Sequence, residues 1–341
     1  MPETSEQIEE QMAKQKGQGA QIQKNATDSA SVTKDAARCG FCKSGNQRAA
    51  FFTDRLATFF FCSAGIFLVG LLFIFAGYII YAGRDSLTFH FLTSPPRFMQ
   101  KGGGIGPQLF NSIYLLIISS AFSVPIGVGA GIYMAEYARP NSITKAIRLS
   151  LETLSALPSI VVGLFGLLIF INVLGWGFSI MAGAMALMIL NLPVITRVAE
   201  ESIRNVPLTL KEGSLALGAT HWQTIWKLIL PAALPGILSG VILVTGRIFG
   251  EAAALLFTAG MSSPHLNFGD WNPLHYASPL NPFRPAETLA VYTWKVNSEG
   301  LAPDARQIAD GAAAVLIITV FLFNILARYI GRTLQKRGYS H

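Results

Sequence analysis

Long apolar stretches without a charged residue alternate with short charged segments along most of this chain, and three of the longest cover 56–83, 102–135 and 153–196. A membrane-spanning helix needs about 20 apolar residues, so the third stretch is too long for one span. Gly175-Trp176-Gly177 interrupts it with turn residues and divides it into two spans. Six spans are predicted, at about 57–81, 111–134, 153–174 and 178–197, from near Pro231, and between Asp310 and Arg328. The pattern predicts an all-α integral membrane protein, a bundle of six transmembrane helices with both termini on one side.

The distribution of basic residues predicts which side that is. Of the 26 Lys and Arg residues, 19 fall in the terminal segments and loops on the side of the termini. Six lie in the two opposite loops, 82–108 and 259–308, and Arg247 lies within a span. Basic residues concentrate on the cytoplasmic side of membrane proteins. We therefore expect a multi-pass protein of the plasma membrane, surrounded by lipid, with both termini in the cytoplasm.

Composition excludes two other classes of protein. Only 13% of the 341 residues are charged, about half the share usual in soluble domains. The net charge of +7 does not indicate nucleic-acid binding, because the basic residues flank apolar runs instead of lining one folded face. We expect neither a soluble globular protein nor a nucleic-acid partner.

Residues 1–50 are polar and lack sustained apolar periodicity, which predicts a mostly disordered cytoplasmic tail ahead of a membrane domain at 51–335. Cys39 and Cys42 form a CxxC pair in this tail, but no second pair of ligands follows, and the five histidines are scattered. No metal site is predicted.

Glycines spaced as GxxxG recur within the predicted spans. Small residues at this spacing let helices approach closely in lipid, where the hydrophobic effect does not drive association. The pairs are Gly127 and Gly131, Gly236 and Gly240, and Gly246 and Gly250. Together they favour a closely packed bundle.

The loop at about 207–231 has the pattern of two short helices separated by a glycine turn. Thr209 and Glu212 fit a capping box that would begin the first helix, and Gly218 can end it in a left-handed conformation. Thr220 and Gln223 fit a second capping box. One interpretation is an ordinary connecting loop with capped ends. The spacing of its residues favours a loop with a specific function over this interpretation.

The spacing from Glu212 to Gly218 and on to Leu230-Pro231 resembles that of the EAA loop in type I ABC importer permeases (MetI-like). Gly213-Ser214 stands in place of Ala-Ala. The resemblance implies a helix that docks on a separate ATPase subunit and couples transport to ATP hydrolysis. The loop positions that it marks are Glu212, Gly213, Ser214, Gly218, Ala219, Thr220, Leu230 and Pro231.

Further blocks resemble the phosphate-transport permeases of the PstA family over about 55–335. They are Pro158–Phe165, Leu192-Pro193 with Arg197, Glu200 and Glu201, Leu217–Thr220, Arg247–Glu251, and Pro285–Tyr292. The chain has Ala252-Ala253-Ala254 where that family has Thr-Ala-Pro. The resemblance implies a permease subunit for inorganic phosphate, with an ABC ATPase dimer, a second permease and an external phosphate-binding protein as partners.

The chain itself is not expected to be an enzyme or to bind a cofactor. It contains no Gly-Lys dipeptide and therefore no Gly-x-x-x-x-Gly-Lys phosphate loop. No catalytic residue is predicted, and ATP with its Mg²⁺ is expected to act on the partner ATPase.

Two arginines inside or beside the predicted spans are candidates for the anion path. Arg247 lies 16 residues beyond Pro231, about 24 Å along a helix, with Glu251 four residues further on one helix face. Arg197 has Glu200 and Glu201 three and four residues beyond it. In one interpretation, the arginines and glutamates neutralise one another and hold the bundle together. In the other, the arginines attract an anion while the glutamates hold the arginines in place. In the PstA-like permeases, arginines matching Arg197 and Arg247 are implicated in the phosphate path.

Three alternatives stay open at this point. Arginine chemistry suits sulfate or molybdate as well as phosphate. A gradient-driven secondary transporter would need no ATPase, and a membrane scaffold would transport nothing. The aromatic residues of the loop at 259–308, Trp271, Tyr276 and Trp294 among them, fit either an interfacial belt or a docking surface for an external binding protein.

Overall fold

The computed structural model describes residues 47–97, 100–300 and 303–338, and the predicted tail with Cys39 and Cys42 lies almost wholly outside this part. The chain divides into two units, one ending at Leu72 and one beginning at Phe73. Helices make up all the regular structure of the described residues. Five of them are long and apolar enough to cross a membrane, and one bent pair is a further candidate.

The first unit contains most of α2 (Gln47–Gly83), which includes the predicted span at 57–81. Large apolar side chains cover this helix on all sides, and Phe59, Phe67 and Ile74 are each about 70% exposed in the single chain. A helix that is hydrophobic all round is typical of a membrane span. The first predicted span is confirmed.

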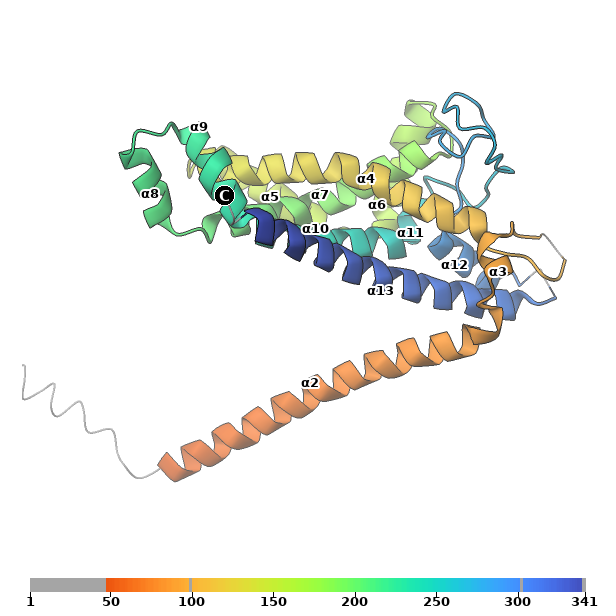
Figure 1. Cartoon of the computed structure of the whole chain (residues 1–341), viewed down its shortest axis with the longest axis horizontal. Coiled ribbons are helices and arrows are strands. Elements are labelled where there is room, and N and C mark those ends of the chain that lie inside the picture. Colours follow the sequence, from red (N-terminus) through yellow and green to blue (C-terminus); the bar gives the residue numbers. More distant parts are fainter. Residues whose placement is uncertain (1–46, 98–99, 301–302, 339–341) are drawn as a thin grey trace, which may run out of the picture. The chain divides into compact units, whose positions relative to one another are not determined.

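Long helices of the second unit run beside one another (Figure 1). They are α4 (Gly106–Ile132), α7 (Ile180–Arg204), α10 (Leu230–Gly250) and α13 (Ala305–Gly338). One end of this bundle carries α8 (Leu208–Ala216) and α9 (His221–Thr224), and we call it the α8 end. The opposite α12 end carries α3 (Phe89–Thr93) and α12 (Leu289–Glu299).

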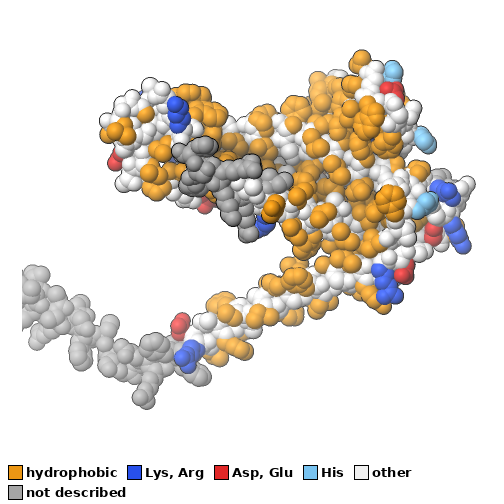
Figure 2. All heavy atoms as spheres, in the orientation of Figure 1, with side chains coloured by type: hydrophobic (Ala, Val, Ile, Leu, Met, Phe, Trp, Pro, Cys, Tyr) orange, Lys and Arg blue, Asp and Glu red, His pale blue; other side chains and the backbone are white. Residues whose placement is uncertain are grey.

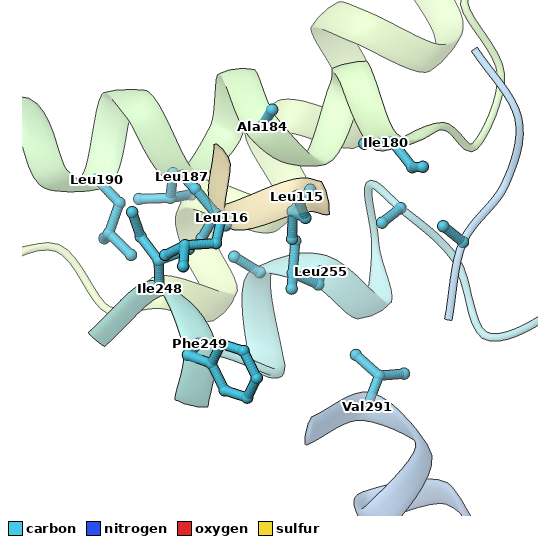
Figure 3. Close-up of a cluster of buried hydrophobic side chains, with 14 of the residues drawn as sticks. Leu115, Leu116, Ile180, Ala184, Leu187, Leu190, Ile248, Phe249, Leu255 and Val291 are labelled. Carbon is cyan, nitrogen blue, oxygen red and sulfur yellow. The ribbon is translucent and has the colours of Figure 1, made fainter. Parts of the chain in front are cut away.

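Helix α7 lies at the centre of the packing and contacts α4, α5, α6 and α10. Leu115 and Leu116 of α4, Leu187 and Leu190 of α7, and Ile248 of α10 point into the shared core (Figure 3). Figure 2 shows hydrophobic side chains over the middle of this unit, with most of the visible charged side chains toward its two ends. That distribution fits a bundle embedded in lipid.

Small residues bring the neighbouring helices close to α7, as the GxxxG pairs predict. A Cβ atom at Gly127 would lie 2.6 Å from the Ile195 side chain, and one at Gly131 would lie 2.5 Å from Ala199. On α10, Gly236 and Gly240 face Ser202 and Val198 of α7 just as closely. The third pair differs, because Gly246 meets only the side chain of Asn324 at 3.4 Å and Gly250 meets nothing within 4 Å.

The predicted third span at 153–174 is wrong in its first part. Helix α5 (Ser142–Ala156) ends before Pro158, and the chain turns by 101° into α6 (Ser159–Gly166) and the π-helical η3 (Leu167–Val173). Proline disfavours helical geometry in the residue before it. The 15 residues after the bend reach about 22 Å, which is less than the ~30 Å hydrocarbon core.

The boundaries of the fourth and fifth predicted spans are confirmed, with a shift in position for the fifth. Gly175 and Gly177 have positive φ angles of 68° and 65°, which confirms the break before the fourth span. The fifth span begins ten residues before Pro231, because α9 continues through the π-helical η4 (Ile225–Ile229) into α10. Beyond Gly250 the chain is extended at Glu251 and then forms α11 (Ala253–Leu256).

A substitution that adds one methyl group at Gly131 tests the close contact of this residue with α7. Gly131→Ala is expected to destabilise the protein in detergent by about 1–3 kcal/mol, because overpacking must push α4 away from α7. At Gly129, on the same helix, an added Cβ meets nothing within 4 Å, so Gly129→Ala should leave the Tm unchanged or raise it slightly. Thermal unfolding of both variants measures the difference, and equal Tm values would contradict the close packing.

Candidate functional site

The segment between α7 and α10 forms two short helices with a tight turn, as predicted. Gly218 lies between them with φ of 83°, the left-handed conformation expected of it. The second capping box is confirmed: Thr220 Oγ1 accepts from the Gln223 amide at 3.3 Å, and Gln223 Oε1 accepts from the Thr220 amide at 3.0 Å. The first is wrong, because α8 begins at Leu208 with Pro207 as its N-cap and Thr209 already inside the helix.

This helix–turn–helix presents apolar side chains to the surroundings. Leu217 is 90% exposed, Leu208 70% and Trp222 59%. Glu212, Gly213 and Gly218 are exposed in the same projection, and no residue of α8 is buried. Exposed apolar groups of this kind mark protein interaction sites. The predicted coupling positions therefore lie on a surface that a partner can reach.

Beside this projection, a groove of about 550 Å³ runs between α5 and α7. Charged residues of both signs line it: Arg148, Arg197, Arg204, Glu152, Glu200 and Glu201. Arg197 is exposed within the groove. Among the residues described, no carboxylate lies within 4.0 Å of its guanidinium. It is free to bind an anion in this single chain.

The predicted pairing of Arg197 with Glu200 and Glu201 is therefore wrong. Glu200 Oε1 instead accepts from Arg148 Nη2 of α5 at 2.5 Å and from Arg204 Nε of α7 at 2.9 Å. Arg204 also donates to the carbonyl oxygen of Met134 at 3.2 Å. Two arginines thus neutralise Glu200 and tie α7 to its neighbours, which leaves Arg197 unpaired.

Arg247 and Glu251 do not share a helix face, contrary to the prediction. Helix α10 ends at Gly250, and Glu251 follows in an extended conformation. Glu251 Oε1 accepts from the amide of Ala254 at 3.4 Å and so caps α11. Arg247 is exposed, and no ion pair joins it to Glu251 in the described part of the chain.

The two candidate arginines also lie at different heights in the bundle. Gly240 of α10 packs on Val198, the residue after Arg197. Arg247 lies seven residues further along α10, which is about 10 Å toward the α12 end at 1.5 Å per residue. An anion that visits both residues must move along the bundle between them.

A second polar cluster lies at the α12 end, beside a pocket of about 470 Å³ that Glu287 and Gln108 help to line. Glu287 is 3% exposed and accepts from Gln108 Nε2 and Lys295 Nζ, each at 3.0 Å. Burial raises the pKa of its carboxyl, although both contacts act to lower it. This cluster was not predicted, because Gln108 and Glu287 lie 179 positions apart in the sequence.

Arg284 is fully buried near this cluster and was also missed. Its Nη2 donates to Asn111 Oδ1 at 2.8 Å and to the carbonyl oxygen of Pro279 at 3.0 Å. Burial lowers its pKa to about 10, so it stays charged at neutral pH. Its contacts hold the loop before α12 against α4, which is a structural role.

Three comparisons place the chain among known proteins. A family model described as the inner membrane component of binding-protein-dependent transport systems matches residues 127–337. The probable ABC transporter permease protein YqgI of Bacillus subtilis is 52% identical over 285 residues, which are 84% of this chain and 97% of that protein. The phosphate transport system permease protein PstA of Yersinia pestis is 34% identical over 250 residues, 73% of this chain and 78% of that one.

The fold matches solved transporters as well. The bacterial alginate ABC transporter in complex with its pentasaccharide-bound periplasmic protein contains a chain that superposes with a TM-score of 0.58 at 16% identity, covering 85% of this chain and 99% of that chain. This likeness concerns the fold alone, that of a type I importer permease. The family model covers more than half of the chain, and so the chain belongs to the inner membrane components of binding-protein-dependent transport systems, the permeases of ABC importers.

Proposed function

We propose that this permease carries inorganic phosphate. The observation that carries the proposal is Arg197, exposed in the groove between α5 and α7 without an acidic partner among the described residues. The guanidinium group has a planar fork of donors that matches phosphate oxygens. Similarity to a permease named for phosphate transport supports the same substrate. Arg247, at another height in the bundle, is the second proposed station on the path.

The glutamates support these arginines in a different way from the one predicted. Glu200 holds Arg148 and Arg204 at the edge of the groove, so that fixed positive groups flank Arg197. Glu201 lines the same groove, and Glu251 fixes the turn after Arg247 through its cap on α11. A phosphate ion then meets one unpaired guanidinium in a groove whose three arginines and three glutamates balance in charge, which favours release over tight binding.

The proposed assembly has an ABC ATPase dimer on the α8 end, with α8 and its exposed Leu217 docked on it. A second, related permease and an external phosphate-binding protein complete the importer. In this orientation the α8 end and both termini face the cytoplasm, as the distribution of Lys and Arg predicts. ATP and Mg²⁺ act on the partner ATPase, since the chain carries no phosphate-binding loop.

Membership of the ABC importer family overturns two of the alternatives, the gradient-driven transporter and the non-transporting scaffold. Sulfate and molybdate are the substrates that compete with the proposal, because they present similar oxygens to an arginine. ATP-dependent uptake of labelled phosphate by the reconstituted complex, with sulfate and molybdate as competitors, decides between them. Uptake of sulfate in preference to phosphate would reject the proposed substrate.

Charge removal at the two arginines tests the path. Arg197→Gln and Arg247→Gln should each assemble and lower phosphate uptake about tenfold or more, the loss expected with one charged hydrogen bond. The double variant Arg247→Gln with Glu251→Gln should transport no better than Arg247→Gln alone, because the two residues form no ion pair. Lysine at either position should keep part of the rate.

Arg328→Gln is the matched control for these variants, because Arg328 is exposed on α13 outside the groove. It should transport phosphate at the rate of the unchanged protein. Normal uptake by an assembled Arg197→Gln variant would show that Arg197 is not on the path.

The turn at Gly218 tests coupling. Gly218→Val must place a β-branched residue at φ of 83°, a strain of about 1–3 kcal/mol that the loop can relieve only by changing shape. We expect the complex to hydrolyse ATP with strongly reduced uptake. Gly129→Val, at a helical position of α4 outside the coupling loop where a Cβ meets nothing within 4 Å, is the control and should transport normally. Equal uptake by the two variants would contradict the coupling role of the turn.

Thiol labelling tests the orientation. In a cysteine-free background, a cysteine at Leu274, which is 86% exposed in the loop before α12, should react with an impermeant reagent added to intact cells. A cysteine at Ser142, exposed at the start of α5, should react only after the cells are opened. The reverse pattern would place the α8 end outside.

A further inference from the structure

The carboxylate of Glu136 joins the projecting loop to the membrane-spanning bundle. It belongs to η2 (Tyr133–Tyr137), the π-helical turn that ends α4 at the α8 end. Glu136 Oε2 lies 2.5 Å from Lys211 Nζ of α8 and 3.6 Å from His221 Nε2 of α9. The Glu136 side chain is only 7% exposed, whereas Lys211 is 25% exposed. One buried carboxylate thus faces basic groups from both helices of the loop.

Internal contacts make the two short helices move as one piece. Ser214 of α8 and Thr224 of α9 share a hydroxyl–hydroxyl hydrogen bond of 3.0 Å. The capping box at Thr220 and the turn at Gly218 fix the angle between the helices. Because α9 runs without interruption through η4 into α10, any displacement of the loop is passed directly to α10.

Helix α7 is connected to α8 through residues 205–207, whereas α4 and α13 have no direct chain connection to the loop. Helix α8 has no buried residue and packs mainly on α9 and η4. Among the described residues, its side-chain hydrogen bond outside the loop runs from Lys211 to Glu136 and bridges 75 positions of sequence. The ring of Tyr137, next to Glu136, lies 5.3 Å from the His221 ring and adds a second contact at the same place.

Helix α4 connects this contact to the opposite end of the bundle. It packs along α7 through Gly127 and Gly131, and at its other end Gln108 donates to Glu287 beside the α12-end pocket. A displacement imposed on Glu136 therefore acts on the helix that joins the two ends. Pro125 within α4 removes one backbone hydrogen bond and marks a place where such a helix bends.

We propose that Glu136 is the positioning residue through which movement of the α8–α9 loop reaches α4. The inference rests on the proposed role of this loop in ATPase coupling and adds a route into α4 beside the chain connections to α7 and α10. Loss of the carboxylate leaves the loop attached only to α7 and α10, its neighbours in the chain. ATP hydrolysis then continues, because the docking surface on α8 is intact, but fewer phosphate ions cross for each ATP consumed.

The test compares phosphate transported per ATP hydrolysed in the reconstituted complex. Glu136→Gln and Lys211→Gln should each lower this ratio about fivefold or more, the range of a typical coupling between sites, while ATP hydrolysis changes little. The double variant Glu136→Lys with Lys211→Glu restores opposite charges and should recover most of the ratio. Lys227→Gln, which removes an exposed charge from η4 near the same loop, is the control and should keep the full ratio.

Lys211→Gln covers the case in which Glu136→Gln fails to assemble, because it changes the more exposed partner of the pair. An unchanged ratio in either assembled single variant would overturn the proposal. So would a double variant with exchanged charges that is no better than the single ones.

A second measurement does not depend on the transported substrate. Spin labels at Thr209 of α8 and Tyr133 of η2, the turn that ends α4, should keep one distance when ATP is added to the complex. Glu136→Gln should broaden the distribution of that distance. A distance that changes equally with ATP in both proteins would show that α8 and α4 are not held together. If this measurement succeeds while phosphate uptake is absent, the assigned substrate is wrong and the role of Glu136 stands.

Discussion

Close approach of helix backbones around α7 is the constraint on which the rest of this structure depends. In lipid the hydrophobic effect does not hold helices together, so association relies on van der Waals contact and interhelical hydrogen bonds. Gly127 and Gly131 of α4, and Gly236 and Gly240 of α10, face α7 where even one added carbon would clash. These contacts set the position of α4 and α10 relative to α7, the helix that also forms one wall of the groove containing Arg197.

The same packing separates the polar chemistry into two regions. At the α8 end, Glu200 accepts from arginines of α5 and α7, and the Glu136 carboxylate faces Lys211 of α8 and His221 of α9. At the α12 end, Glu287 and Arg284 are buried among amide and carbonyl partners. Between the regions the helices meet through apolar side chains (Figure 3). Movement at one end can thus reach the other only through the displacement of whole helices.

Much of this was predictable from sequence, because span length, glycine spacing and turn chemistry are local properties. The spans, the break at Gly175, the left-handed Gly218 and the Thr220–Gln223 cap all follow from such rules. The errors arise where partners are distant in sequence. Glu200 pairs with Arg148, which is 52 positions away in the sequence, and not with the nearby Arg197. Glu251 lies off the helix face of Arg247 because the chain becomes extended after Gly250. Pro158 itself indicates the bend, but a span predicted from apolar composition alone continues through this position.

The bend at Pro158 has an electrical consequence. The leg after it reaches about 22 Å, and on the α5 side of the bend a groove lined by six ionisable side chains runs between α5 and α7. Water in such a groove carries the potential of the adjoining solution toward the middle of the bilayer, so the voltage falls across a thinner layer. An anion that enters a cell with a negative interior works against about 2.3 kcal/mol per charge for each 100 mV. For the phosphate ion of the proposed path, the bend at Pro158 thus concentrates that cost into the short apolar leg.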